Sequence, residues 1–222
     1  MTSSEKPGRR RSAIGLSRQK AVSDLKRGLI LDAARRVFQS EGLDGASIRA
    51  IATEAGYTAA ALYFHFPSKE AIYAEVLKES LERLRDAVDD AVRRAGTPAG
   101  RLRAAAMTFF TFYADNPRDL DLGFYLFRGG MKPQGLGRER DDLLNAALAS
   151  ALGAIQTAAE ELGATHDEAK LLMVDAFGHA AGLLLLGHTG RMRLFGASAS
   201  ALMARYVDHA IERLNARPPA DD

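Results

Sequence analysis

The sequence contains no cysteine among its 222 residues. This absence excludes disulfide bonds, thiolate metal sites and cysteine nucleophiles. No run approaches the roughly 18 apolar residues that span a bilayer, and the longest apolar block, at 180–186, is interrupted by Gly182. The N-terminus is polar and basic and lacks the apolar core of a secretory signal. We therefore expect a soluble, cytoplasmic protein without a membrane partner.

Basic side chains are concentrated toward the N-terminus. Residues 1–70 hold 12 Lys or Arg and 7 Asp or Glu, whereas the other 152 residues hold 18 and 21, so the two parts carry +5 and −3. A basic head on a mildly acidic body favours a polyanionic partner. Residues 1–22 hold few apolar side chains, and we expect a disordered basic arm there. The arm is either a solubilising tail or a segment that follows DNA phosphates.

Sustained period-two alternation is missing throughout, so we expect no sheet. Apolar residues instead recur at three- and four-residue spacing, which predicts an all-α fold of about nine helices. Breaks are expected at Gly42, at Gly56, at the pair Asn116-Pro117 and in a loop at 129–137. We predict a disordered basic arm at 1–22 and two helical domains, at 23–70 and 71–217.

Two short helices joined by a turn are predicted within residues 47–66. Ser47 and Thr58 are placed to cap the starts of these helices, and Gly56 lets the chain reverse without a Cβ clash. Leu62 and Phe66 lie four residues apart and anchor one face of the second helix. With a further helix in front, the pattern is that of a helix-turn-helix module.

Residues 47–73 read SIRAIATEAGYTAAALYFHFPSKEAIY and resemble the signature of the TetR family of transcriptional regulators. In that signature a glycine, a hydrophobic residue and a Ser or Thr precede a helix that ends in an aromatic-rich segment, and a turn with a lysine follows. The resemblance covers about residues 25–75, and beyond them it is only architectural. The matching residues are Gly56, Tyr57, Thr58, Leu62, Tyr63, His65, Phe66, Lys69 and Glu70.

The resemblance also implies which residues contact DNA. Tyr63 and His65 would reach phosphates or base edges, and Lys69 would bind a phosphate at a helix N-terminus. Arg49 is the candidate guanine reader, because its guanidinium can bridge O6 and N7. The expected DNA-binding residues are Ser47, Arg49, Thr58, Ala59, Ala60, Tyr63, His65 and Lys69.

Each assignment has a simpler structural alternative. Ser47 and Thr58 could serve only as helix caps, Tyr63 could pack inside the head, and His65 and Lys69 could be ordinary surface residues. This chain also departs from the family, because alanine occupies 59–61 where relatives commonly have a polar reader. Alanine offers only a methyl contact to thymine, so specificity would depend on Arg49, Tyr63, the basic arm and DNA shape.

Aromatic residues are unusually dense in the body of the chain. Seven of the 16 aromatic residues lie between 109 and 127, on two consecutive predicted helices divided at Pro117. They form either plain core packing or the wall of a cavity for an apolar or aromatic inducer, and the family resemblance favours the cavity. The expected ligand-binding residues are Met107, Phe110, Tyr113, Phe124, Phe127 and Phe177.

The predicted helix at 167–187 is apolar on more faces than one core needs. Its small residues Gly178, Ala181 and Gly182 would let another helix approach closely, and the resemblance implies a homodimer through the last two helices. Asp175 and His179 share a face of this helix, but a third ligand at matching spacing is missing. We therefore expect no metal, no cofactor and no enzymatic activity.

Together with these patterns, the family resemblance implies a ligand-responsive transcriptional repressor. Its helix-turn-helix DNA-binding domain would be residues 23–70, and its ligand-binding and dimerisation domain would be residues 71–217. The repressor would bind a palindromic operator as a dimer and be released by a small apolar or aromatic inducer. One alternative is a constitutive DNA-binding architectural or regulatory protein that has no small-molecule ligand. Another is a repressor whose body binds a partner protein.

Overall fold

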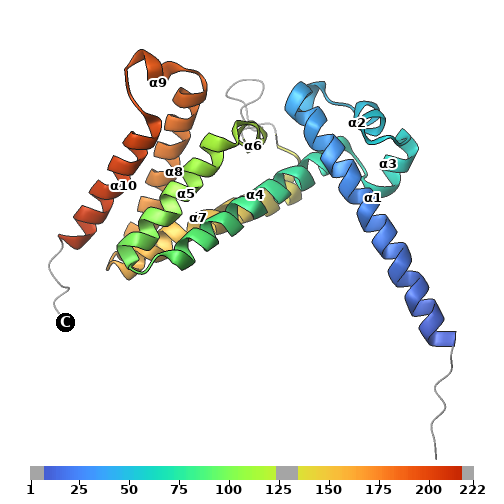
Figure 1. Cartoon of the computed structure of the whole chain (residues 1–222), viewed down its shortest axis with the longest axis horizontal. Helices are drawn as coiled ribbons and strands as arrows, with labels where there is room; N and C mark the ends of the chain where they lie inside the picture. Colours follow the sequence, from blue (N-terminus) through green and yellow to red (C-terminus); the bar gives the residue numbers. More distant parts are fainter. Residues whose placement is uncertain (1–7, 124–134, 217–222) are drawn as a thin grey trace, which may run out of the picture. The chain divides into compact units, whose positions relative to one another are not determined.

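The computed structural model describes the backbone of residues 8–123 and 135–216, with side chains from residue 19 onward. Within these ranges all regular structure is helical, in ten helices, which confirms the predicted all-α fold. The chain divides into two compact units, Met1–Val76 and Leu77–Asp222, each of which is described by itself (Figure 1). The division falls inside α4 (Lys69–Arg94) rather than after Glu70, because the first turns of α4 belong to the core of the first unit.

The first unit begins with the long helix α1 (Gly8–Gly45). The predicted disorder of residues 1–22 is corrected here, because residues 8–22 are helical; residues 1–7 lie outside the described part. Arg, Lys, Gln, Leu and Ala in this segment favour a helix, and extending an existing helix needs no new nucleus. The predicted break at Gly42 is confirmed by its φ of 71° and ψ of 179°, which interrupt the helix.

Two short helices, α2 (Ile48–Ala55) and α3 (Ala59–His65), follow as predicted. The hydroxyls of Ser47 and Thr58 accept the backbone N–H groups of Ala50 and Ala61, so both residues are caps. Gly56 has a φ of 72°, a left-handed conformation that turns the chain between the helices. The turn therefore has the geometry that the sequence pattern predicts.

The core of the first unit contains side chains from α3 and from the flanking helices α1 and α4. Leu62 and Phe66 are buried, as expected of the anchoring face of α3. The ring of Phe38 from α1 meets that of Tyr73 from α4 edge to face, with centroids 4.9 Å apart. Aromatic pairs in this arrangement add to the stabilisation from area burial alone.

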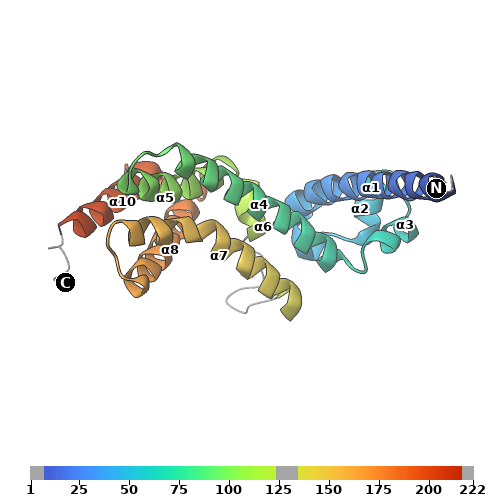
Figure 2. The same ribbon diagram turned by 90° about the horizontal axis from the view of Figure 1, so that it is seen from below.

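The second unit contains the rest of α4 and six further helices. The predicted break at Asn116-Pro117 is confirmed, whereas most of the predicted loop at 129–137 lies outside the described residues. The central helix α5 packs against α7, α8 and α10 (Figure 2). The six helices are α5 (Pro98–Asp115), α6 (Pro117–Gly123), α7 (Arg138–Glu161), α8 (His166–His188), α9 (Arg191–Leu194) and α10 (Ala199–Asn215).

Candidate nucleic-acid interface and ligand cavity

Helix α3 has one buried and one exposed face. Leu62 is fully buried against the rest of the head, whereas Tyr63 is 57% exposed and Phe64 is 85% exposed. Ala60 is exposed as well. Burial of Tyr63 inside the head is therefore wrong, and its ring is available to a partner. Phe64 was not expected at the interface, although its position outside the Leu62–Phe66 face could have revealed it.

The start of α2 presents further polar groups to solvent. Arg49 is exposed on the first turn of α2, which leaves its guanidinium accessible to a base or phosphate. Ser47 and Thr58 accept N–H bonds through their hydroxyl oxygens, and each hydroxyl still has a proton to donate. Capping and a phosphate contact are therefore compatible at both residues.

Arg27, which lies on α1, contacts both the end of α3 and the first turns of α4. Its guanidinium lies 4.3 Å from the centroid of the Phe66 ring and 3.1 Å from the Glu75 carboxylate. It also donates to the backbone oxygen of His65 at 3.5 Å. These contacts fix the position of His65, which is half-buried with its ring edge-on to that of Phe64.

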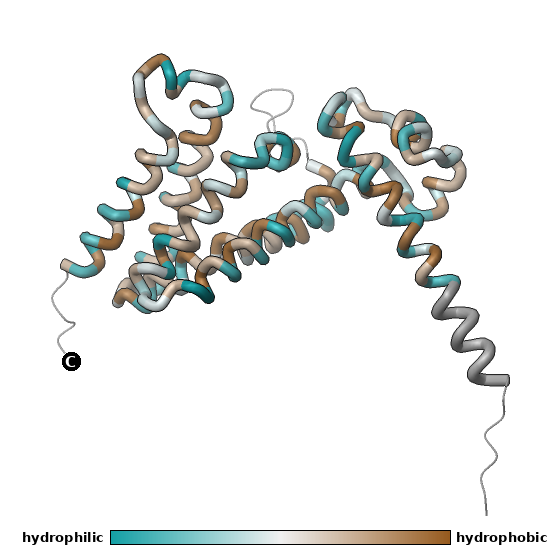
Figure 3. The backbone as a smooth tube through the Cα atoms, in the orientation of Figure 1, coloured by the Kyte–Doolittle hydropathy of each residue, from teal (hydrophilic) through white to brown (hydrophobic). Residues whose placement is uncertain are grey.

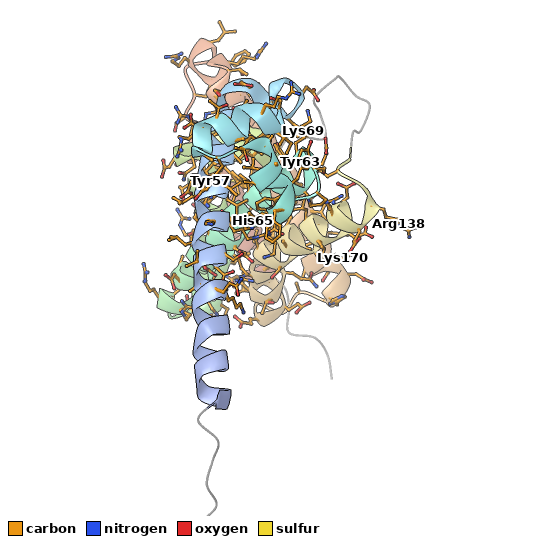
Figure 4. All side chains as sticks on the ribbon, turned by 90° about the vertical axis from the view of Figure 1, so that its right-hand side faces the viewer. Tyr57, Tyr63, His65, Lys69, Arg138 and Lys170 are labelled. Carbon is orange, nitrogen blue, oxygen red and sulfur yellow. The ribbon has the colours of Figure 1, made fainter. Side chains whose placement is uncertain are left out.

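Lys69 has an intramolecular function that the sequence did not predict. Its ammonium group donates to the carbonyl oxygens of Leu43 and Ala46, at 2.9 and 3.2 Å. Both carbonyls lie just after the break at Gly42, where helical hydrogen bonding is interrupted. Because an ammonium group has three donors, at most one remains for a phosphate. Figure 4 shows Tyr63, His65 and Lys69 on this unit.

We expect Lys69→Ala to lower the free energy of unfolding by about 1–3 kcal/mol, because it leaves two carbonyl groups without a charged donor. Thermal unfolding followed by circular dichroism measures this loss. Lys170→Ala removes an exposed lysine from α8 and serves as the control. An unchanged unfolding temperature for Lys69→Ala would show that these two hydrogen bonds contribute nothing to stability.

The second unit contains a partly open apolar cavity of about 90 Å³. Helices α4 to α8 all contribute to its wall, and Tyr113 and Asn145 are the lining residues with polar side-chain groups among those described. The lining residues are Leu77, Leu81, Phe109, Tyr113, Leu120, Gly123, Leu144, Asn145, Leu148, Phe177, Ala181 and Leu184.

The cavity includes Tyr113 and Phe177 from the predicted ligand-binding set. Phe109 lines it in place of Phe110, because Phe109 and Tyr113 lie four residues apart and share a face of α5. The Phe109 ring packs edge-on against both Tyr113 and Phe177, with centroids 5.3 and 5.9 Å apart.

The other predicted ligand-binding residues do not line the cavity. Phe110 is buried in the core one position round the helix, and Met107 is half-buried outside the lining. Phe124 and Phe127 lie outside the described residues. The i, i+4 spacing was the available signal for Phe109, whereas Asn145 and Leu148 carry no such signal in the sequence.

The hydroxyl group of Tyr113 stays protonated at neutral pH. Burial raises its pKa above the ordinary value, and the carboxylate of Asp119 raises it further. Asp119 is itself buried and forms an ion pair with Arg83 at 3.0 Å. The described wall of the cavity is therefore uncharged, with a neutral hydroxyl and an amide as its hydrogen-bonding groups.

Helix α8 exposes an apolar stripe that the single chain leaves uncovered. Leu171, Val174 and Leu185 are 65%, 52% and 57% exposed. A Cβ atom placed on Gly178 or Gly182 would meet no heavy atom within 4 Å. Figure 3 shows the hydrophobic character of α8. By length and composition α8 alone among the described helices could cross a membrane, which differs from the sequence-based expectation, but the core helix of a soluble protein can meet the same criterion.

The Asp175 and His179 pair is not part of a metal cluster in the described residues, where no group of three potential ligands occurs. The His179 ring instead stacks on that of Tyr206 from α10, with centroids 4.4 Å apart and planes inclined by 19°. Burial raises the pKa of Tyr206, and the Asp175 carboxylate adds to this effect. The histidine therefore contributes to the packing of α8 on α10.

An exposed short helix, braced by a second helix through a left-handed glycine turn, defines a helix-turn-helix DNA-binding domain. Residues 30–76 match the family described as "Bacterial regulatory proteins, tetR family". This match includes residues 47–73, so the resemblance of these residues to the TetR family signature is confirmed.

The curated relatives match up to about half of the chain. The transcriptional activator FasR of Mycolicibacterium smegmatis is 38% identical over 109 residues, which cover 49% of this chain and 50% of FasR. The transcriptional repressor KstR2 of Mycobacterium tuberculosis is 35% identical over 85 residues, covering 38% and 42%. The chain thus spans about half the length of the curated relatives it matches.

Solved structures show the same fold over most of the chain. FadR of Bacillus subtilis, in complex with stearoyl-CoA, has a TM-score of 0.64 and 19% identity and covers 82% of this chain and 96% of its own. The fatty acid degradation regulator FadR of Bacillus halodurans has a TM-score of 0.64 and 18% identity and covers 84% and 94%. The fold is therefore shared across both units.

Proposed function

We propose that this protein is a ligand-responsive transcriptional repressor that binds a palindromic operator as a homodimer. The observation that carries the proposal is the presence, in one chain, of an exposed recognition helix with Tyr63 57% exposed and a separate apolar cavity. A small apolar or aromatic inducer would occupy the cavity and release the protein from DNA. Such a regulator acts in the cytoplasm and needs no catalytic residue or cofactor.

The exposed stripe on α8 supports the homodimer. Leu171, Val174, Gly178, Gly182 and Leu185 follow one another at spacings of three, four, four and three residues. The spacing is the same in both directions from Gly178, so two antiparallel copies can cross there with matching faces. A C2 interface requires such self-complementarity.

The side-chain sizes also agree with this crossing. In the antiparallel pairing Leu171 faces Leu185 of a second copy, and Val174 faces Gly182. The two Gly178 residues meet at the centre, where the absence of side chains allows the backbones to approach closely. A second copy of the chain would therefore bury the exposed apolar residues of α8. The alternative is that these residues contact a membrane.

The cavity supports a ligand that is apolar along most of its length. Its described wall is apolar apart from the Tyr113 hydroxyl and Asn145. FadR of Bacillus subtilis shares the fold and was solved with stearoyl-CoA. The cavity is partly open, so a long acyl chain can enter it with one end and extend beyond it. We therefore include a long acyl chain, beside a small aromatic compound, among the ligand classes proposed for this site.

The test begins with an operator selected from a random duplex library. Stearoyl-CoA, palmitic acid and a panel of neutral aromatic compounds are then added separately, and DNA release is followed by fluorescence anisotropy. Release by one class, saturating at one ligand per protomer, is expected. Unchanged DNA binding with every probe, together with no ligand bound in native mass spectrometry, favours a constitutive DNA-binding protein.

Leu148→Trp is expected to abolish the ligand response and leave operator affinity unchanged. Leu148 is half-buried at the cavity wall on α7, and an indole ring would fill space of about 90 Å³. The dose-response curve for DNA release measures the effect. Leu143→Trp changes an exposed leucine of the same helix and should respond as the unmodified protein does. A normal response from Leu148→Trp would place the ligand elsewhere.

A further inference from the structure

A groove of about 600 Å³ runs beside the recognition helix, between α3 and the N-terminal half of α1. Its α1 wall includes Gln19, Lys20, Ser23 and Lys26, and its other wall includes Tyr57, Phe64 and His65. In Figure 4 the labelled Tyr57 and His65 lie next to α1. Every described residue of the lining belongs to the first unit, and Tyr63 and Arg49 are not among them.

The side chains of the groove are mainly hydrogen-bond donors. Lys20 and Lys26 are exposed, and within the described residues neither has a carboxylate partner. The Gln19 amide, the Ser23 hydroxyl and the Tyr57 hydroxyl add neutral donors. Among the described residues of the lining, Asp24 is the one that is acidic. The apolar part of the described lining consists of Val22, Ile30, Ala61 and Phe64. Hydrogen-bond donors beside apolar side chains fit a polyanion, a chain of phosphates and sugars, better than a cationic partner.

The position of the groove identifies the polyanion. A recognition helix lies in the major groove, which is about 12 Å wide and is bordered by the sugar-phosphate backbones of both strands. An element that runs alongside the recognition helix therefore meets one of these backbones. Because α1 is helical from Gly8, Lys20 and Lys26 are held on a rigid element rather than on a disordered arm.

We propose that this groove binds the backbone of the DNA strand that borders the major groove, with Lys20 and Lys26 as phosphate contacts and the exposed Phe64 ring against deoxyribose. This inference rests on the proposed DNA-binding function and adds a second contact region to it. The contacts to phosphate carry no base information, so they increase affinity for every sequence and make it more dependent on salt.

The double variant Lys20→Ala, Lys26→Ala in the full-length protein tests the proposal on a random-sequence 30-base-pair duplex. The slope of log affinity against log salt concentration should become shallower by about 0.9 for each phosphate that the variant no longer neutralises. Ethylation interference should also lose its signal at phosphates flanking the recognition-helix footprint. Lys170→Ala, Arg138→Ala removes two exposed cations from the second unit and should leave both measurements unchanged.

The outcomes separate this proposal from the proposed function. If Tyr63→Ala weakens binding while the Lys20, Lys26 variant keeps the original slope, the groove proposal fails and DNA binding by α3 stands. If the unmodified protein shows no salt-dependent DNA binding, the proposed function fails as well. An equal loss of slope in the Lys170, Arg138 control would show a general charge effect and would overturn the groove assignment.

Discussion

Gly178→Leu is expected to convert the dimer to a monomer and to lower operator affinity by roughly 100-fold or more, because bivalent binding to two half-sites is lost. A side chain at the centre of the proposed α8 crossing would hold two copies apart. Within one chain the new Cβ meets no heavy atom within 4 Å, so the protomer itself should fold. Analytical ultracentrifugation measures the oligomeric state, and electrophoretic mobility shift measures the affinity.

Gly153→Leu provides a matched control for this prediction. Gly153 also lies within a helix, α7, and a Cβ placed there likewise meets no heavy atom within 4 Å. Replacing either glycine with leucine should stabilise its own helix by up to about 1 kcal/mol. Gly153→Leu should remain dimeric and bind the operator normally. A dimeric Gly178→Leu variant would show that the α8 crossing is not the interface.

Arg49→Ala is expected to relax preference at one guanine position by about 1–3 kcal/mol, the cost of removing a bidentate hydrogen-bonded pair. The neighbouring recognition helix begins with three alanines, which offer no hydrogen bonds to bases. We therefore expect the guanidinium of Arg49 to carry much of the direct readout. Binding to a randomised operator library at fixed salt gives the preference at each position.

Tyr63→Phe serves as the comparison for Arg49→Ala. It removes a hydroxyl and keeps the exposed ring, so it should weaken binding evenly across sequences if that hydroxyl holds a phosphate. Loss of preference at one position with Tyr63→Phe, and a uniform loss with Arg49→Ala, would reverse the assignment of base reader and backbone contact.

The parts of the fold that depend on local chemistry were predictable from the sequence. Ser47 and Thr58 cap their helices, Gly56 turns the chain, and Pro117 begins a new helix, because each effect depends on a few neighbouring residues. The prediction of a disordered arm was wrong for residues 8–22. There the helix propensity of Arg, Lys and Leu and the continuity with the rest of α1 outweigh the low apolar content.

The parts of the site that depend on tertiary packing were not predictable. The hydrogen bonds of Lys69 to Leu43 and Ala46 span 26 and 23 residues, and only the folded chain brings these groups together. The i, i+4 spacing indicates that Phe109 shares a face of α5 with Tyr113, but whether this face lines the cavity depends on how α5 is rotated against α7 and α8. Likewise, the groove lined by Lys20 and Lys26 forms only because the N-terminal part of α1 lies beside α3 in the folded chain.

The spacing of bound half-sites tests the central claim most directly. Operators selected from a random library should be palindromes whose half-sites are centred about 34–36 Å apart, because two recognition helices of a dimer enter successive major grooves. The selected full site should bind far more tightly than an isolated half-site under the same salt. Equal affinity for the half-site and the full site would contradict recognition by a dimer.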